Sequence, residues 1–308
     1  MSKTNLPLTK QMSVAEFDRM FPNDEACMRY LQARRWPKGV ECPRCANSKV
    51  YPARTKPFHW ICKQHADNKN YRFSLTVGTI FENTNVGLLR WFKVLYLMLT
   101  SKKGMSALQV HRTLGAEYGA KVGSYKTSWY MCHRLRAGLA DPQFIQLMGI
   151  VEVDETYIGG RDKNRHRSKR TGITGGSNKM TVVGAIARKG NIVCQLVEVA
   201  DTKTLEAFVR MAVDRKVTLI ATDDAGGYRK LVDGGFPHAT VAHMRGEYVR
   251  GAVHTNSIES FWSLLKRGVV GTYHSMSRKY LPLYLNEFVF RYNNRHNEDI
   301  FGAAVASY

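Results

Sequence analysis

The sequence has few acidic side chains for its length. Its 308 residues include 25 Asp and Glu against 46 Lys and Arg, so the formal net charge is +21. The positive excess runs through the whole chain, which indicates a polyanionic partner, most simply nucleic acid. A basic protein of membrane surfaces is the alternative, but no basic amphipathic helix dominates the sequence.

Long apolar runs are missing as well. The longest run, near Trp91–Leu99, contains Lys93 and is too short to cross a bilayer. Residues 1–12 are polar and lack the apolar centre of a signal peptide. We therefore expect a cytoplasmic protein without a membrane partner, in which the six cysteines are reduced.

Three of those cysteines cluster with a histidine. Cys42-Pro-Arg-Cys45 is followed, after sixteen residues, by Cys62-Lys-Gln-His65. Two knuckles at this spacing fit a tetrahedral structural Zn²⁺, and the β-type runs between them predict a zinc ribbon over residues 36–82. The predicted ligands are Cys42, Cys45, Cys62 and His65. His59 competes with His65 for the fourth position, and a small β-unit with free thiols is the alternative to a metal site.

Helical periodicity lies on both sides of the predicted ribbon. Residues 1–35 are expected to form an N-terminal helical segment, and residues 83–145 a helical domain. Two helices of that domain, at 105–114 and 125–139, suit a helix-turn-helix DNA reader, with Lys126 and Arg134 as DNA contacts. An ordinary helical hairpin is the alternative.

Residues 146–308 alternate strands and helices. Strands are expected at 150–158, 181–187, 192–199, 217–221 and 238–242, and helices at 202–215, 254–267 and 278–294. An antiparallel meander followed by parallel strands with crossover helices predicts an RNase H-like α/β domain with a mixed five-stranded sheet. The whole chain is therefore expected to be an α+β multidomain protein.

Three acidic residues occupy special places in this predicted domain. Asp154 lies in the first strand, Asp223 ends the fourth, and Glu259 belongs to the helix that should pack across them. Three converging carboxylates suit two Mg²⁺ or Mn²⁺ ions, which activate a water or a 3′-hydroxyl and stabilise the leaving oxygen of a phosphodiester.

Neighbouring acids compete for these assignments. Asp224 follows Asp223 directly, and Glu152 and Glu155 flank Asp154. Strand alternation places Glu152 on the same face as Asp154.

The motifs of this region resemble those of a known family. Val151–Gly160, Thr222-Asp223 with Tyr228, His254–Arg267 and Phe290–Arg295 are similar to the motifs of ISXO-like insertion-sequence DDE transposases. Cys42-Pro-Arg-Cys45 and Phe73–Phe81 resemble that family's N-terminal part. By position, Asp154, Asp223 and Glu259 match the catalytic acids of the family.

The resemblance implies a bacterial transposase, associated with the nucleoid. Such an enzyme cuts at the terminal inverted repeats of its element and joins the 3′-hydroxyl to target DNA. Synapsis of two ends implies a homodimer or a larger assembly on double-stranded DNA.

Basic residues near the acids complete the predicted DNA site. Lys266 and Arg267 lie two turns along the helix from Glu259, where they would bind a phosphate backbone. A Gly-rich basic loop is expected at residues 161–180, with DNA contacts from Arg165, Arg167, Lys169 and Arg170. A solvated loop without contacts is the alternative.

Two other functions are compatible with the pattern. One is a DNA-binding regulator or a catalytically inactive transposase derivative. The other is an RNase H-like nuclease acting on RNA or on junctions, which would need the acids but not the ribbon.

Overall fold

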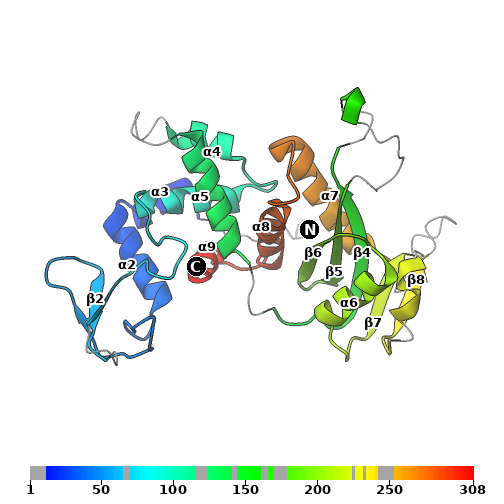
Figure 1. The fold of residues 1–308 in the computed structure, drawn as a ribbon, viewed down its shortest axis with the longest axis horizontal. Helices are drawn as coiled ribbons and strands as arrows, with labels where there is room; N and C mark the ends of the chain where they lie inside the picture. The colour runs from blue at the N-terminus through cyan, green and yellow to red at the C-terminus, as the bar shows by residue number, and fades with distance from the viewer. Residues whose placement is uncertain are drawn as a thin grey trace, which may run out of the picture. The chain divides into compact units, whose positions relative to one another are not determined.

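The computed structural model describes nine stretches of the chain. They are residues 12–64, 70–115, 124–140, 144–160, 166–169, 179–223, 226–231, 234–241 and 253–308. The chain divides into two compact units, Met1–Ala140 with Arg295–Tyr308, and Asp141–Asn294 (Figure 1). None of the described helices is long and apolar enough to cross a membrane.

The first unit combines helices with a small antiparallel sheet. Its helices are α1 Val14–Met20, α2 Asp24–Arg35, α3 Leu88–Thr100, α4 Ala107–Gly115, α5 Tyr125–Gly138 and α9 Ile300–Ala306. Strands β1 Val50–Pro52, β2 His59–Cys62 and β3 Tyr71–Ser74 pair in chain order.

The C-terminal helix α9 packs in this first unit. Its Phe301 ring lies 5.4–6.1 Å from the rings of Phe17, Phe21, Tyr30 and Phe92. We expected residues 295–308 to belong with the preceding catalytic domain, and the division of the chain differs at this point. Burial of Phe301 among these aromatic side chains explains the difference.

The second unit is built on a five-stranded mixed sheet. Its strands are β4 Ile150–Ile158, β5 Met180–Ala187, β6 Ile192–Val197, β7 Leu219–Asp223 and β8 His238–Val241. Their order is β6-β5-β4-β7-β8, with β4, β5 and β6 antiparallel and β4, β7 and β8 parallel. This confirms the predicted fold class and the predicted mixed sheet.

Helices cover the two faces of this sheet (Figure 1). α6 Thr202–Ala212 packs on the face that carries Val151 and Val153 of β4. α7 Asn256–Gly268 and α8 Leu281–Asn293 pack on the other face, against β5 and β6. Because side chains alternate along β4, the even-numbered residues Glu152, Asp154 and Thr156 face α7.

Three short helical turns complete the described part of this unit. They are the 3₁₀ turns Arg167–Lys169 and Gly226–Leu231 and the π-helical turn Val269–Tyr273, which follows α7 directly.

Candidate active site and zinc ribbon

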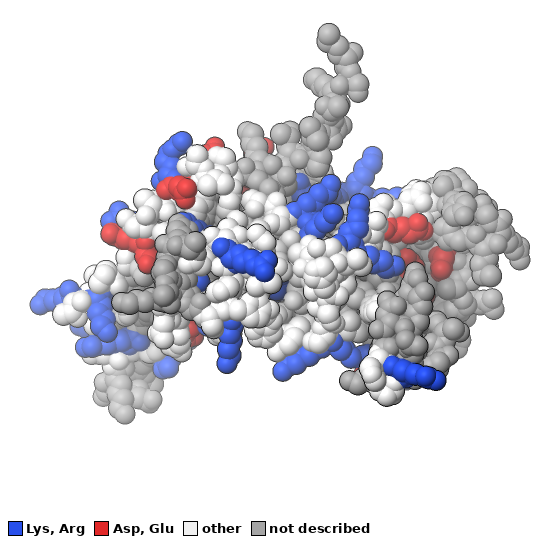
Figure 2. Space-filling view, turned by 90° about the horizontal axis from the view of Figure 1, so that it is seen from above, with Lys and Arg blue, Asp and Glu red and all other residues white. Residues whose placement is uncertain are grey.

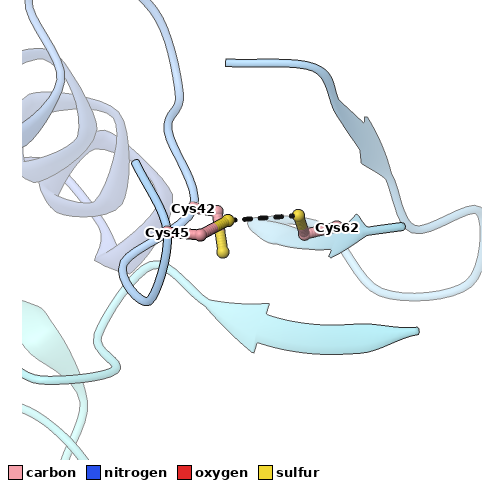
Figure 3. Close-up of side chains that lie close together, drawn as sticks. All are labelled: Cys42, Cys45 and Cys62. Atoms are coloured by element: carbon pink, nitrogen blue, oxygen red, sulfur yellow. Dashed lines mark hydrogen bonds between the residues drawn. The ribbon is translucent and has the colours of Figure 1, made fainter. Parts of the chain in front are cut away.

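The three ribbon cysteines lie together, with Cys42 and Cys45 on a loop beside the end of β2 that carries Cys62 (Figure 3). The sulfur atoms of Cys42, Cys45 and Cys62 are all within 4.8 Å of one another, and those of Cys45 and Cys62 are 3.8 Å apart. Two sulfurs bound tetrahedrally to one Zn²⁺ at about 2.3 Å lie about 3.8 Å apart. The spacing therefore fits three of the four corners of a structural zinc site.

The fourth ligand remains a prediction. His65 lies outside the described residues. The competitor His59 is described and is not among the ligand-type side chains within 4.8 Å of one another, and its Nδ1 atom lies 2.9 Å from the Pro57 carbonyl oxygen.

Loss of one cluster cysteine should remove the metal. We expect about one zinc per chain in the purified protein, and loss of most of it in Cys62→Ser, with a lower unfolding temperature of the first unit. Cys194→Ser is the matched control, since Cys194 lies in β6 of the second unit. Elemental analysis with thermal unfolding tests this, and wild-type protein without zinc would contradict it.

Strand pairing sets Asp154 beside Asp223. The parallel register of β4 and β7 runs from Ile150 opposite Leu219 to Glu152 opposite Ala221. The paired segment ends two residues before each acid, so Asp154 and Asp223 follow it on neighbouring strands, and the charge of Asp223 acts on Asp154.

The electrostatics of Asp154 reflect this neighbourhood. Burial, followed by the charges of Glu155 and Asp223, raises the pKa of Asp154 from 3.8 to about 7. A group of this kind is stabilised in its charged form by a bound cation.

Helix α7 contacts Asp154 through Trp262. The indole Nε1 donates a hydrogen bond of 3.0 Å to Asp154 Oδ2. Gly184 of β5 pairs with Asp154 and leaves room for the indole, since a Cβ atom there would lie 2.7 Å from the Trp262 ring.

A methyl group at this glycine should therefore disturb the site. Gly184→Ala is expected to displace the indole from Asp154 and to lower the free energy of unfolding by about 1–3 kcal/mol. Tryptophan fluorescence and chemical denaturation measure both effects. Gly160→Ala is the matched control, because nothing lies within 4 Å of its added Cβ. Equal stability of the two variants would rule out this close-packing role.

Asp154 and Glu259 line the same cleft. Its volume is roughly 550 Å³, and its other charged lining residues are Glu155, Lys266 and Arg267. Thr255 Oγ1 donates a hydrogen bond of 2.6 Å to Glu259 Oε1. Figure 2 shows basic side chains gathered beside a smaller acidic group on the unit with the five-stranded sheet.

The three predicted acids are brought near one another but not into one tight group. Asp223 is not among the lining residues of the cleft, although its charge acts on Asp154. Among the residues that the structure describes, only the three cysteines form a set of three ligand-type side chains within 4.8 Å of one another. Asp154 accepts its hydrogen bond from Trp262 through Oδ2, and Glu259 accepts its hydrogen bond from Thr255 through Oε1.

The competing acids differ from one another in their surroundings. Glu155 accepts a 2.6 Å hydrogen bond from the buried Tyr228 hydroxyl. Burial raises the pKa of Glu155 despite that bond. Asp224 lies outside the described residues, so the choice of Asp223 stays a prediction.

Glu152 has a role that sequence reasoning missed. It is fully buried and accepts hydrogen bonds from the backbone N–H groups of Ser257 (2.8 Å) and Ile258 (3.1 Å) in the first turn of α7. Arg188 Nε donates to it at 2.8 Å, and His254 Nδ1 lies 3.2 Å away. Glu152 thus caps the helix that carries Glu259, where the N-cap residue Thr255 makes no side-chain capping bond.

The predicted DNA contacts fall into three groups. Lys266 and Arg267 are exposed in the cleft wall, and Lys126 and Arg167 are exposed on their own elements. Arg134 donates hydrogen bonds of 2.8 Å to the Glu82 carbonyl and the Tyr130 hydroxyl, and its contact with DNA stays a prediction. The structure does not describe Arg165, Arg170 or the side chain of Lys169.

Comparison with known proteins finds a matching transposase family for each of the two units. Residues 146–293 match the family described as ISXO2-like transposase domain, and residues 22–64 match the transposase zinc-ribbon domain. An uncharacterized protein in transposable element ISH50 of Halobacterium salinarum is 29% identical over 290 residues, covering 89% of this chain and 92% of that protein.

A solved structure shows a weaker similarity. It is the simian T-cell lymphotropic virus intasome in complex with PP2A regulatory subunit B56 gamma, with 10% identity and a TM-score of 0.31. The match covers 60% of this chain and 68% of that one, and at this score it adds nothing to the fold. The two family matches together span more than half of the chain, so the chain combines a region similar to the ISXO2-like transposase domain with a region similar to the transposase zinc-ribbon domain.

Proposed function

We propose that this chain is a transposase, which binds the terminal inverted repeats of its element, cuts the DNA there and transfers the resulting 3′-hydroxyl into target DNA. The cleft of the second unit carries the proposal, because Asp154 and Glu259 line it together with Lys266 and Arg267. A site where a phosphodiester reacts needs both acidic side chains, which bind cations, and basic side chains, which bind phosphates.

Asp154, Asp223 and Glu259 are the proposed ligands of two Mg²⁺ or Mn²⁺ ions. Their donor set consists of oxygen atoms alone, which fits these hard cations. When bound, the ions would activate the attacking group, water for cutting and the 3′-hydroxyl for strand transfer, and would stabilise the leaving oxygen. The side chains of this chain do the remaining work: Trp262 orients Asp154, Glu152 fixes the start of α7, and Lys266 and Arg267 hold the phosphate backbone.

The first unit is the proposed reader of the element's ends. α4 and α5 pack as a helical pair, and Lys126 is exposed at the start of α5. The zinc ribbon, which precedes these two helices in the sequence, would stabilise the first unit. Joining two ends in one reaction calls for a homodimer or a larger assembly on the DNA of the nucleoid.

Nicking of a supercoiled plasmid tests this function. With Mg²⁺, the protein should nick a plasmid that carries the element's ends and leave a plasmid without the ends largely intact. A chelator should stop nicking and leave binding to the ends. Binding without nicking in Mg²⁺ or Mn²⁺ would instead support a regulator, and equal cutting of RNA–DNA hybrids would support a nuclease.

A further inference from the structure

A second cleft lies next to the one that holds the acids. Its volume is roughly 540 Å³. The residues that line it come from the end of β4, from the start of β5 and from the segment that follows α7. Val270 lines both clefts, so they are neighbours on the surface of the second unit.

The charged lining of the second cleft is basic. Lys179, His274 and Arg278 line it, and no Asp or Glu is among its described lining residues. The guanidinium of Arg278 is 3.7 Å from the carboxylate of Glu198, whose side chain is 94% exposed. Such an exposed pair is weak, so Arg278 retains its capacity to bind an anion.

The turn between the clefts has an unusual backbone and an exposed apolar tip. Val269–Tyr273 is a π-helical turn, and His274 after it has a φ of 58°. A π-helical turn is rare and occurs frequently at functional sites, and a positive φ is uncommon for a residue other than glycine. Val270 is 73% exposed at this turn, where an apolar side chain gains nothing from water.

We propose that the second cleft binds the backbone of the DNA strand that continues past the reacting phosphate, with Val270 packed against a base or sugar between the two clefts. Lys179 and Arg278 would contact successive phosphates, and an apolar side chain at a bend in DNA packs on exposed base surface. This inference rests on the proposed function, because it takes the acid cleft as the position of the reacting bond.

The charge part is tested by binding across a salt series. A labelled duplex with one element end is titrated with wild type and with Lys179→Gln/Arg278→Gln, in Ca²⁺ to suppress cutting. We expect about 10- to 100-fold weaker binding by the variant and a salt slope smaller by about 2. Lys203→Gln/Lys216→Gln is the matched control, since both lysines are exposed in the same unit and line neither cleft.

The control variant should bind within about twofold of wild type, and Arg278→Lys should keep the slope, because the charge is retained. Circular dichroism and the unfolding temperature establish that each variant is folded. Equal affinity and equal slope for Lys179→Gln/Arg278→Gln and the control would overturn the inference.

The apolar part is tested with Val270→Ser, which changes an exposed side chain and no charge. We expect the salt slope of binding to be unchanged and the nicking of end-bearing plasmid to be about 10-fold slower. The fluorescence of a 2-aminopurine placed next to the cut should change less on binding of the variant than on binding of wild type. Wild-type rates would overturn this role of Val270. If wild type does not nick but the charge variant binds less tightly, the proposed catalysis fails and the second cleft remains a DNA site.

Discussion

Asp154→Asn is expected to abolish both plasmid nicking and strand transfer, with rates at least about 10³-fold below wild type. The amide keeps the shape of the side chain and still accepts the hydrogen bond from Trp262 Nε1, so the packing of α7 on β4 is retained. What is lost is the negative charge that a divalent ion needs. Binding to end DNA should therefore stay within about twofold of wild type.

The same substitution should raise stability above neutral pH. The pKa of Asp154 is raised to about 7 in the folded protein, well above the usual value of an unfolded aspartate. For an acid with a raised pKa, folding is favoured while the group is protonated, and stability falls as pH rises from about 4 through 7. Asn cannot ionise, so the variant should escape that loss, which for a pKa raised from 3.8 to about 7 is on the order of 4 kcal/mol at pH 8.

Thermal unfolding at pH 5 and pH 8, with and without Mg²⁺, measures this prediction. Wild type should gain stability from Mg²⁺ at pH 8, because the ion offsets the repulsion around Asp154, and Asp154→Asn should gain little. Asp223→Asn and Glu259→Gln should likewise lose catalysis. Strand transfer retained by any of the three variants would remove that residue from the set of proposed ligands.

Glu152→Ala is expected to lower the free energy of unfolding by about 3–5 kcal/mol. The substitution removes a buried carboxylate that accepts four hydrogen bonds, from Arg188 Nε, from Ser257 N–H and Oγ, and from Ile258 N–H. The side chain of Arg188 is 19% exposed and would lose its ion pair, and the first turn of α7 would lose its cap. Since α7 carries Glu259, a small shift of the helix should also slow nicking by about 10²-fold.

Chemical denaturation and the Mg²⁺ dependence of nicking separate these effects. Glu152→Gln keeps the side-chain shape and should fall between wild type and Glu152→Ala in stability. Without denaturant, Glu152→Gln should need more Mg²⁺ than wild type to reach its half-maximal nicking rate, and it should bind end DNA normally. A loss of stability alone would not produce this combination.

Glu206→Gln provides the control for a lost ion pair. Glu206 pairs with Arg210 one turn away on α6, and both side chains are partly exposed. Its removal should cost less than about 0.5 kcal/mol. If Glu152→Ala is no less stable than Glu206→Gln, the buried cap does not hold α7 in place.

Local patterns were sufficient to predict the frame of the second unit. Alternation over residues 150–158 predicted β4, and the 3.6-residue periodicity after His254 predicted α7. The run 217–221, which is apolar except for Thr218, predicted a central strand. The strand found there is β7 Leu219–Asp223, and it pairs on both sides with parallel neighbours. Such patterns depend on which face of an element is buried, and that information is present in the chain itself.

Local sequence patterns could not predict contacts between side chains that are far apart in the chain. Trp262 and Asp154 are separated by 108 positions, and Glu152 and Ser257 by 105. Gly184 leaves room for the indole of Trp262 only because the register of β4 and β5 and the position of α7 bring the two residues together. The place of Phe301 was missed for the same reason, because its aromatic partners Phe17, Phe21 and Phe92 come from the other end of the sequence.

The central claim is that Asp154, Asp223 and Glu259 hold the catalytic ions, and anomalous scattering from Mn²⁺ tests it most directly. Crystals of the full chain with an end duplex and Mn²⁺ should show two manganese peaks about 3.5–4 Å apart, each within bonding distance of these carboxylates. Manganese held instead by Glu155, or no manganese in this cleft while the bound duplex is cut, would contradict the account.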